Sequence, residues 1–473
     1  MITPNSVIYH IITDRFDNEF GNLSSVINQQ DYNSRFRDYL GGTFKGITNR
    51  AQYLEELGIT NVLISPVCES KDYHGYNIEN YLKVNPRFGT EEDLKKMIKE
   101  LKKRDIGVII DYVATHLSST SPLFIRKFNS KRGKDWFIHK GLKNQRKYRA
   151  YYDELVYKST QGCPEKLNDI NVTKEYLGFF GLETSPLINL MNSEVIEFHK
   201  KILDYWIDNF GFSDVRFDSA YIQPREFIGE IKDHLKNRYS EISLITENWD
   251  FIIDSGRSLG FSNGEIDIKG VFLFNGIKDN SRFLRDVRDH YIKMKDLTKL
   301  GYSLILSLGN HDTKRFDAGP SFQKIAATIQ FTLPETPLIY YGQEIPMERY
   351  NDGSDQMGQS RDPMRFDLLP SEMLEFYKNL TRFRRRHDFR KAEISEMKVN
   401  EDNQLFSYRL NIKGNTYYII VNLEDKERSI NTYNLFEDKN IPNFDITRKR
   451  RLKRDGKNIL IIGANESCIL GKE

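Results

Sequence analysis

The sequence predicts an α/β protein: a (β/α)8 TIM barrel with a small domain inserted after the third strand and a C-terminal antiparallel β-domain. Three observations predict this fold class. Eight short apolar runs alternate with amphipathic stretches, as the strands and helices of a parallel barrel do. One long stretch after the third run has no clear period. The last part of the chain changes to strands of alternating polarity.

The eight apolar runs are rich in Val, Ile, Leu and Tyr, as strands buried on both faces are. They span residues 7–12, 61–64, 107–113, 214–217, 243–246, 270–274, 302–308 and 336–341. Amphipathic patterns between and after them predict helices. These span residues 50–57, 90–103, 193–210, 227–238, 322–331 and 372–386. Gly58 is expected as a C-cap, and Thr90 and Ser193 are expected as N-caps.

Domain boundaries follow from the two places where this rhythm breaks. The stretch 117–190 is too long for a simple connection, so we expect a small inserted domain B there. From about residue 387, the motifs LFSYRL, NTYYIIVNL and NILIIG are separated by turn signals such as Lys413-Gly414-Asn415. The prediction is therefore a barrel of residues 1–116 and 191–386, domain B at 117–190 and a C-terminal β-sandwich at 387–473.

Composition and charge exclude several classes of protein. Of the 473 residues 39% are hydrophobic, yet no apolar run approaches the ~18 residues of a membrane span. The N-terminus lacks a basic segment followed by an apolar one, and the three cysteines lie far apart, so a cytoplasmic location is expected. The net charge of +3 argues against nucleic acid as a partner. The basic stretch 448–454 is interpreted as a solvated cluster, with an RNA-binding or anionic-surface patch as the alternative.

Ionisable and aromatic side chains follow most of the predicted strands, where a barrel of this kind carries its active site. A single acid at a strand end is usually structural, but like charges gathered at one rim repel each other. A structural rim has no need of them, so we interpret the set as a catalytic site. The set holds six acids and three histidines, together with Tyr76 and Arg216. The acids are Asp14, Asp111, Asp218, Glu247, Asp312 and Glu344, and the histidines are His74, His116 and His311.

Cleavage of a glycosidic bond requires two carboxyl groups, one ionised and one protonated. Arg216 lies two residues before Asp218, so both side chains point to the same side of their strand. An adjacent guanidinium keeps Asp218 ionised, as a nucleophile requires. Glu247 ends the neighbouring strand, and the flanking Trp249 is expected to favour its protonated form.

Four ordered blocks, GVIIDYVATH, DVRFDSA, LITENWD and LSLGNHD, resemble the signature blocks of the α-amylase family of retaining glycoside hydrolases (family 13). SPLINLMNSEV, YYGQEI and RDPMRF resemble further blocks of that family, and the resemblance spans roughly residues 6–390. The SPLIN block and the absence of a Lys-His pair at Tyr221 and Ile222 resemble maltodextrin- or neopullulanase-type members more than secreted calcium-rich α-amylases.

The resemblance implies a role for each matching residue. Asp218 matches the family's nucleophile, Glu247 its general acid/base and Asp312 its transition-state stabiliser. The remaining matches are implied as substrate-binding residues. They are His74, Tyr76, Asp111, His116, Arg216, His311 and Arg361.

Departures from the family pattern argue against a metal site, and no cofactor is expected. Thr115 stands where the family often has a calcium-ligating Asn, and a threonine hydroxyl is a poorer ligand. The stretch 17–22 resembles a second calcium loop, but Thr43 stands where those relatives carry Asp.

The predicted function is hydrolysis of α-glucosidic bonds in malto-oligosaccharides or related α-glucans through a covalent glycosyl-enzyme. One alternative is an α-glucan transglycosylase or a sucrose- or trehalose-type enzyme of the same family. A non-catalytic carbohydrate-binding scaffold is a more distant alternative. The sequence does not determine linkage preference, endo or exo action, chain-length preference or oligomeric state.

Overall fold

The computed structural model describes most of the chain. The described residues are 1–23, 38–160, 175–248, 262–267, 282–299, 302–313, 315–345, 360–400, 404–438 and 440–472, with the isolated positions 271, 273, 274, 276–278 and 347. They form two compact units. One comprises Met1, Ile11–Asn49 and Leu63–Glu265, and the other comprises Ile2–His10, Arg50–Val62 and Ile266–Glu473. Within the described part, no helix combines the length and the apolar character needed to cross a membrane.

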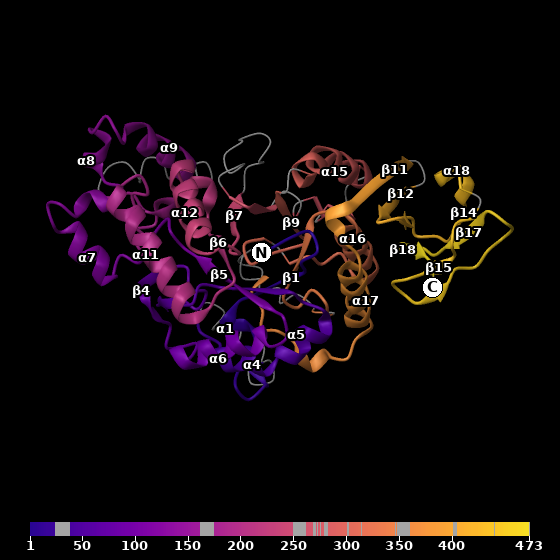
Figure 1. The fold of residues 1–473 in the computed structure, drawn as a ribbon, viewed down its shortest axis with the longest axis horizontal. Coiled ribbons are helices and arrows are strands. Elements are labelled where there is room, and N and C mark those ends of the chain that lie inside the picture. The colour runs from indigo at the N-terminus through magenta and orange to yellow at the C-terminus, as the bar shows by residue number, and fades with distance from the viewer. Residues whose placement is uncertain are drawn as a thin grey trace. The chain divides into compact units, whose positions relative to one another are not determined.

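Eight strands close into a barrel in the order β1-β10-β9-β8-β7-β6-β5-β2 (Figure 1). They are β1 Ile8–Ile11, β2 Asn61–Ile64, β5 Gly107–Tyr112, β6 Asp214–Phe217, β7 Leu244–Asn248, β8 Gly264–Asp267, β9 Ser303–Ser307 and β10 Thr336–Tyr340. Pairing is parallel within each unit: β5 with β6 and β6 with β7 in one, β1 with β10 and β10 with β9 in the other. The predicted barrel is confirmed. An antiparallel pair, β3 Cys68–Ser70 and β4 Ile78–Val84, lies outside it.

The sixth strand is the one wrong strand prediction. We expected it at residues 270–274, but β8 is Gly264–Asp267, and Val271, Leu273 and Phe274 are helical. The apolar run was mistaken for a strand. Val271 and Phe274 are both buried and lie three residues apart, which places them on one face of a helix. The true strand has a weak apolar signal, since its Glu265 is buried and accepts a hydrogen bond from the Asn248 side chain at 2.7 Å.

Helices of the first unit begin and end where local chemistry favours it. Thr90 forms a capping box with Asp93 at the start of α6, and acidic residues fill the first turn. The long helix α11 begins at Ser193, but its N-cap is Asn192, which corrects the predicted cap. Figure 1 shows α11 beside α12. The helices of this unit are α1 Thr13–Phe16, α4 Phe44–Asn49, α6 Glu91–Lys102, α7 Pro122–Phe128, α8 Lys140–Lys143, α9 Arg149–Thr160, α11 Ser193–Phe210 and α12 Arg225–Arg238.

The described part of the stretch between β5 and α11 carries α7, α8, α9 and two short 3-10 helices, η1 Lys134–Trp136 and η3 Phe179–Gly181. A third 3-10 helix, η4 Ala220–Ile222, follows β6 directly and contributes Ile222 to the small apolar core of this stretch. Buried core residues are Ile138, Leu142, Tyr148, Tyr151, Leu155, Leu177, Leu187 and Ile222. Isolated antiparallel bridges join His116 to Leu187 and Phe137 to Ile188. The end of this stretch, at Leu187 and Ile188, therefore lies directly beside residues that follow β5.

The second unit contains the remaining helices and the C-terminal antiparallel sheet. Its helices are α5 Ala51–Leu57, α15 Phe283–Lys299, α16 Pro320–Thr332, α17 Glu372–Arg386 and α18 Thr432–Phe436. Gly58 ends α5 in the left-handed conformation, as expected for a C-cap. The main sheet runs β11-β12-β13-β18-β15-β16, with a separate pair β14-β17. The strands are β11 Ala392–Asn400, β12 Leu405–Ile412, β13 Asn415–Asn422, β14 Arg428–Asn431, β15 Phe444–Asp445, β16 Arg450–Arg451, β17 Ile459–Ile462 and β18 Glu466–Gly471.

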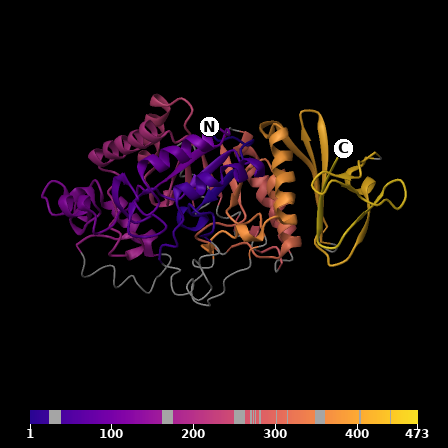
Figure 2. The ribbon, with the colours of Figure 1, turned by 90° about the horizontal axis from the view of Figure 1, so that it is seen from below.

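Polar and apolar contacts attach this sheet to α16. In both ribbon views the yellow C-terminal strands lie beside orange helices (Figures 1 and 2). The Thr328 hydroxyl lies 2.8 Å from the Ser467 hydroxyl, and Thr332 bonds to Tyr408, both on buried faces. A turn at Lys413 and Gly414, both with positive φ, joins β12 to β13 as predicted.

Candidate active site

Arg216 is the centre of a cluster of carboxylates in the first unit. Its guanidinium lies 3.0 Å from Asp218 Oδ1 and 2.9 Å from Glu247 Oε2, and it also donates to Asp111. Asp111 and Arg216 are opposite each other in the parallel register of β5 and β6. Asp218 follows at the spacing that keeps it on the same side as Arg216, as predicted. All four residues are at most 5% exposed.

Burial and charge together set the protonation of this cluster. Burial alone lowers the pKa of Arg216, but the carboxylates of Asp111 and Glu247 outweigh it and raise that pKa well above its ordinary value. Burial raises the pKa of Asp111 to about 6, although Arg216 and the Tyr76 hydroxyl both favour its ionised form. Arg216 is therefore a fixed positive charge, and Asp111 titrates close to neutral pH.

The aromatic residues predicted for this site join the same cluster. Tyr76 donates its hydroxyl proton to Asp111 Oδ2 at 2.8 Å. The Tyr76 backbone N–H donates to His74 Nδ1 at 3.2 Å, and the two rings lie 5.6 Å apart. Burial lowers the pKa of His116 to about 4, despite a hydrogen bond to the Tyr76 backbone, so this imidazole is neutral at pH 7.

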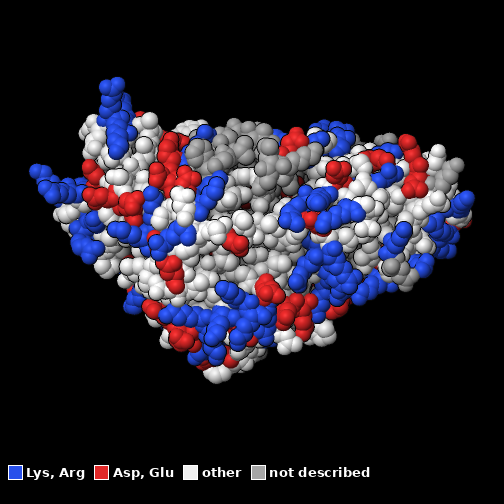
Figure 3. Space-filling view, in the orientation of Figure 1, with Lys and Arg blue, Asp and Glu red and all other residues white. Residues whose placement is uncertain are grey.

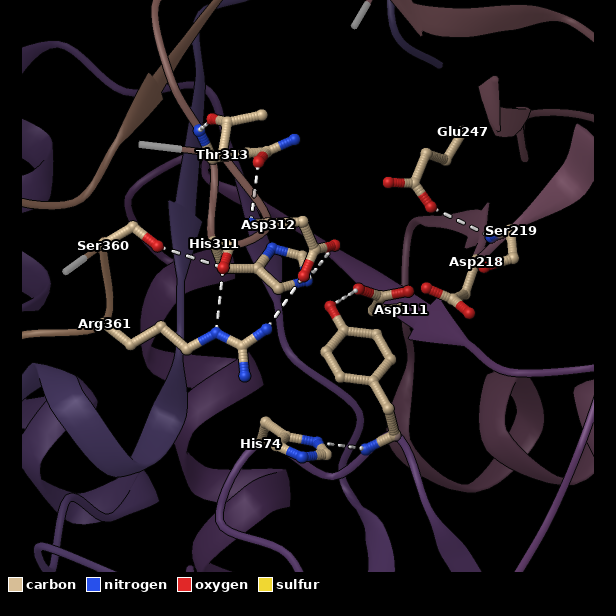
Figure 4. A network of polar contacts seen from close by, with 12 residues as sticks. His74, Asp111, Asp218, Ser219, Glu247, His311, Asp312, Thr313, Ser360 and Arg361 are labelled. Carbon is tan, nitrogen blue, oxygen red and sulfur yellow. Dashed lines mark hydrogen bonds and ion pairs between the residues drawn. The ribbon is translucent and has the colours of Figure 1, made fainter. Parts of the chain in front are cut away.

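Two contacts missed by the sequence analysis hold the proposed catalytic residues: a backbone N–H binds the Glu247 carboxyl, and a side chain binds the backbone of Asp218. The Ser219 N–H donates to Glu247 Oε2 at 3.0 Å (Figure 4), and Ser219 has a positive φ of 50°. The Gln223 side chain donates to the Asp218 carbonyl at 2.8 Å. Ser219 has a left-handed backbone conformation next to a catalytic block, and such conformations concentrate at functional sites. A sequence does not show dihedral angles, so these contacts could not be predicted from it. Trp249 lies outside the described residues.

A second cluster lies in the other unit, after β9. Arg361 donates to Asp312 Oδ1 at 2.8 Å and to the His311 carbonyl at 2.9 Å (Figure 4). His311 Nε2 lies 3.2 Å from Asp312 Oδ2, and the Asn310 side chain accepts the Asp312 N–H at 2.8 Å. The Ser360 hydroxyl donates to the His311 carbonyl at 3.1 Å. The segment 360–361 thus fixes the orientation of Asp312.

The predicted site residues therefore fall into two groups, each brought together by its own unit. One holds His74, Tyr76, Asp111, His116, Arg216, Asp218 and Glu247, and the other holds His311, Asp312 and Arg361. Both follow the C-terminal ends of barrel strands, which is where barrels of this class carry catalytic groups. Paired carboxyls, one guanidinium and neutral hydrogen-bonding rings suit the binding of a hydroxyl-rich neutral substrate and acid–base chemistry on it.

The residues that match calcium ligands in the family do not fit a Ca²⁺ site. The Thr115 hydroxyl is hydrogen-bonded to His116 Nδ1 at 2.9 Å. Asp17 accepts the backbone N–H groups of Asn18 and Leu23. The described residues contain no group of three or more His, Cys, Asp or Glu placed to hold a metal ion. Ca²⁺ needs six to eight oxygen ligands, which these residues do not supply.

Comparison with known proteins agrees with this geometry. The family model described as "Alpha amylase, catalytic domain" matches residues 10–404. Alpha-amylase 2 of Dictyoglomus thermophilum is 29% identical over 451 residues, covering 92% of this chain and 72% of that protein. Neopullulanase 2 of Thermoactinomyces vulgaris is 24% identical over 447 residues, covering 90% and 70%. The crystal structure of an Anoxybacillus alpha-amylase superposes with a TM-score of 0.78 at 23% identity, covering 100% and 99% of the two chains. A catalytic-domain match over residues 10–404, on a closed eight-stranded barrel, places the chain in the alpha-amylase family of glycosidases.

Proposed function

We propose that this chain hydrolyses α-glucosidic bonds in malto-oligosaccharides and related α-glucans with retention of configuration, and that Asp218, Glu247 and Asp312 are its catalytic acids. One observation carries the proposal. The buried guanidinium of Arg216 binds Asp218 and Glu247 at the same time, at 3.0 and 2.9 Å. A retaining glycosidase needs two carboxyl groups held close together on rigid elements, one as nucleophile and one as proton donor.

In the proposed mechanism Asp218 attacks the anomeric carbon, while Glu247 gives its proton to the leaving oxygen. A glycosyl ester forms on Asp218 and the shortened sugar leaves. Glu247 then takes a proton from water, which attacks the ester and regenerates Asp218. Arg216 favours the ionised form of Asp218 before attack and after release. Asp312 stabilises the positive charge that develops on the sugar ring, and Arg361 holds its carboxylate in one orientation.

The proposed substrate is a neutral oligosaccharide. Asp111, Tyr76 and His116 provide acceptors and donors for the hydroxyls of one glucosyl unit, and the neutral His116 adds no charge there. On the face shown in Figure 3, basic and acidic side chains are interspersed over the described surface. The net charge is only +3. Such a surface gives little long-range attraction to charged ligands, and an uncharged substrate needs none.

A cytoplasmic location and a division into barrel, domain B and β-sandwich complete the proposal. Cys68 and Cys468 are free and buried, as cysteines in a reducing compartment commonly are. Burial raises the pKa of both thiols, which keeps them unreactive. Fractionation of cells that express the full chain tests the location, and recovery of the activity outside the cytoplasm would contradict it.

The test of the catalytic assignment is Asp218→Asn. This variant keeps the shape of the side chain but lacks a nucleophilic carboxylate, so kcat on maltotriose should fall by at least about 10⁴-fold with an unchanged melting temperature. Glu247→Gln should lose hydrolysis of maltotriose but still form the ester from α-maltosyl fluoride, because fluoride leaves without a proton; the ester then persists for want of a base, so about one fluoride is released rapidly per enzyme. Substantial turnover by Asp218→Asn would overturn the assignment. Release of the β-anomer first, seen by proton NMR, would overturn retention.

A further inference from the structure

A surface groove with a volume of about 330 Å³ lies between α5 and α17 in the second unit. Sites for small molecules measure roughly 300–1,000 Å³, so the groove is large enough for one small ligand. Four cationic side chains of α17 and two carboxylates of α5 line it. They are Lys378, Arg382, Arg385, Arg386, Glu55 and Glu56.

Close packing of the two helices fixes the floor of this groove. Figure 1 shows α5 beside α17. A Cβ on Gly58, which ends α5, would lie 2.8 Å from the Thr381 hydroxyl oxygen of α17, and the φ of 84° at this position also favours glycine. Higher in the groove, the Lys378 ammonium lies 3.7 Å from the Glu56 carboxylate. The groove is therefore formed by two packed helices rather than by a loop.

The positive charge of the groove exceeds what the fold uses. Arg385 and Arg386 are exposed, and within the described part of the chain neither forms an ion pair. Arg382 is also exposed, and it donates to the neutral side-chain oxygen of Asn379 at 2.6 Å. The dipole of a helix favours cations in its last turn, but Arg382 precedes the last turn of α17. Three guanidinium groups are thus available to an anion. Figure 3 shows basic side chains next to acidic ones where Figure 1 places α17 and α5.

Guanidinium groups and carboxylates in one groove favour a ligand with two chemically different parts. The planar forks of arginine match the oxygens of a phosphate group and bind them with charge-assisted hydrogen bonds. Carboxylates repel phosphate but accept hydrogen bonds from hydroxyl groups, which a sugar presents in number. None of the described residues that line the groove is aromatic, so they offer no ring on which a nucleotide base could stack. The lining therefore suits a sugar that carries a phosphate.

The groove lies at the opposite end of the barrel strands from Asp312. Gly58 comes shortly before β2, and the Thr60 N–H donates to the Val7 carbonyl at 3.0 Å, so this end of β2 lies beside the start of β1. β1 is parallel to β10, and β10 is parallel to β9. Asp312 follows the C-terminal end of β9, which is the end where barrels carry their catalytic groups. A ligand in the groove would therefore not compete with the substrate.

We propose that the groove between α5 and α17 is a binding site for a sugar phosphate. The phosphate group binds the guanidinium groups of Arg382, Arg385 and Arg386, and the sugar hydroxyls donate to the carboxylates of Glu55 and Glu56. The bound ligand joins the two helices and stabilises the folded chain in proportion to its concentration. The inference goes beyond the proposed function and does not rest on it, because none of the proposed catalytic acids is among the described residues that line the groove.

Isothermal titration calorimetry of the full chain with glucose 6-phosphate at low ionic strength tests the proposal. We expect a dissociation constant below about 1 mM. Arg385→Gln and Arg386→Gln should each weaken binding about tenfold, because each variant loses a charge-assisted hydrogen bond to the phosphate. Arg451→Gln removes the same charge from the exposed strand β16, so this matched control should stay within about twofold of the wild type. Absence of binding up to about 10 mM, or equal losses in all three variants, would overturn the proposal.

Titrations with inorganic phosphate and adenosine 5′-monophosphate identify which part of the ligand is recognised. Both should bind more weakly than glucose 6-phosphate, because one lacks sugar hydroxyls and the other carries a base that no ring receives. Glu56→Gln should bring the dissociation constants of phosphate and glucose 6-phosphate closer together, since an amide repels phosphate less and accepts hydroxyl protons less strongly. Equal affinity for all three ligands would overturn the assignment of a sugar phosphate.

A competition experiment separates the groove from the catalytic site. In Asp218→Asn, which should not consume its substrate, saturating maltotriose should leave the titration with glucose 6-phosphate unchanged. Displacement of the phosphate by maltotriose would place both ligands in the catalytic site and overturn the proposal.

Discussion

At the scale of single residues, Arg216 organises the site in the first unit. It is almost fully buried, and each of the three carboxylates around it gains a charge-assisted hydrogen bond. Three acids on one cation leave a surplus of negative charge in a buried place, which a proton on Glu247, as the proposed mechanism requires, reduces. Burial also raises the pKa of Asp111 to about 6. A lysine would supply one charge but no planar fork to reach all three.

The first prediction is a pH dependence that arises at Asp111. As the pH falls through about 6, this carboxyl gains a proton and stops accepting from Arg216 and Tyr76, so kcat/KM on maltotriose should decrease. The pH profile of the wild type checks this. Asp111→Asn should have lower activity, and its profile should lack the acid limb near pH 6. The same limb in that variant would assign it to another group.

Stability should not follow this loss of activity. The folded-state pKa of Asp111 lies above its unfolded value, so between the two values the folded state binds the proton more readily. Its contribution to the free energy of unfolding is unfavourable at neutral pH and becomes less so as the pH falls through 6. Melting curves at pH 7 and pH 5 should therefore show no loss of stability that depends on Asp111, and Asp111→Asn is the comparison that isolates it.

At the scale of elements, the three arginines in the last turn of α17 have two different roles. Arg384 is fully buried and donates to the carbonyls of Pro4, Phe331, Leu333, Pro334 and Glu335. These carbonyls belong to the N-terminal segment and to the connection between α16 and β10. Arg385 and Arg386 are exposed. The last turn of α17 thus includes the residue that joins three segments.

The second prediction concerns this arginine. Arg384→Leu leaves buried carbonyls without a donor, so the free energy of unfolding should fall by about 3 kcal/mol. Urea-induced unfolding followed by tryptophan fluorescence measures it. Arg385→Leu, the neighbouring change on the exposed side of the helix, should shift it by no more than about 0.5 kcal/mol. If both variants lose a similar free energy of unfolding, the buried hydrogen bonds of Arg384 do not account for the loss.

At the scale of the whole molecule, the C-terminal sheet completes the burial of α16. Every residue from Ile325 to Thr332 is buried, and part of that surface is covered by Ser467 and Tyr408 of the sheet. The sheet also has its own apolar core around Phe436, Leu460 and Ile462. The sheet is therefore an integral part of the second unit, because it covers part of α16.

The third prediction is that a chain ending at Arg386 does not fold to an active enzyme. Removal of the sheet would expose the apolar and hydroxyl-bearing face of α16, and exposed faces of this kind cause aggregation. Solubility after expression and activity on maltotriose measure the effect. Ser467→Ala, which removes one hydroxyl from the same contact, should remain soluble and active. A soluble truncated chain with full activity would contradict the structural role of the sheet.

Much of this organisation could be predicted from the sequence because the signals are local. Apolar runs and caps such as Thr90 located seven barrel strands and six of the helices, but not α15 between β8 and β9. The sixth barrel strand, β8, was missed because a buried acid held by Asn248 replaces the apolar signature. The N-cap of α11 was displaced by one residue, since Asn192 and Ser193 are both good caps and only the backbone turn chooses between them.

The sequence by itself determined the fold class and the chemistry-bearing residues, because strand periodicity and the order of the four blocks are properties of the chain. Only the tertiary structure decided how those residues act on one another. Arg216 binds three carboxyl groups, Arg361 orients Asp312, and the Phe179 ring stacks on His116. These contacts depend on distances between residues that are remote in sequence. Burial and electrostatic coupling act through space, so pKa values and contacts of this kind arise only when the chain has folded.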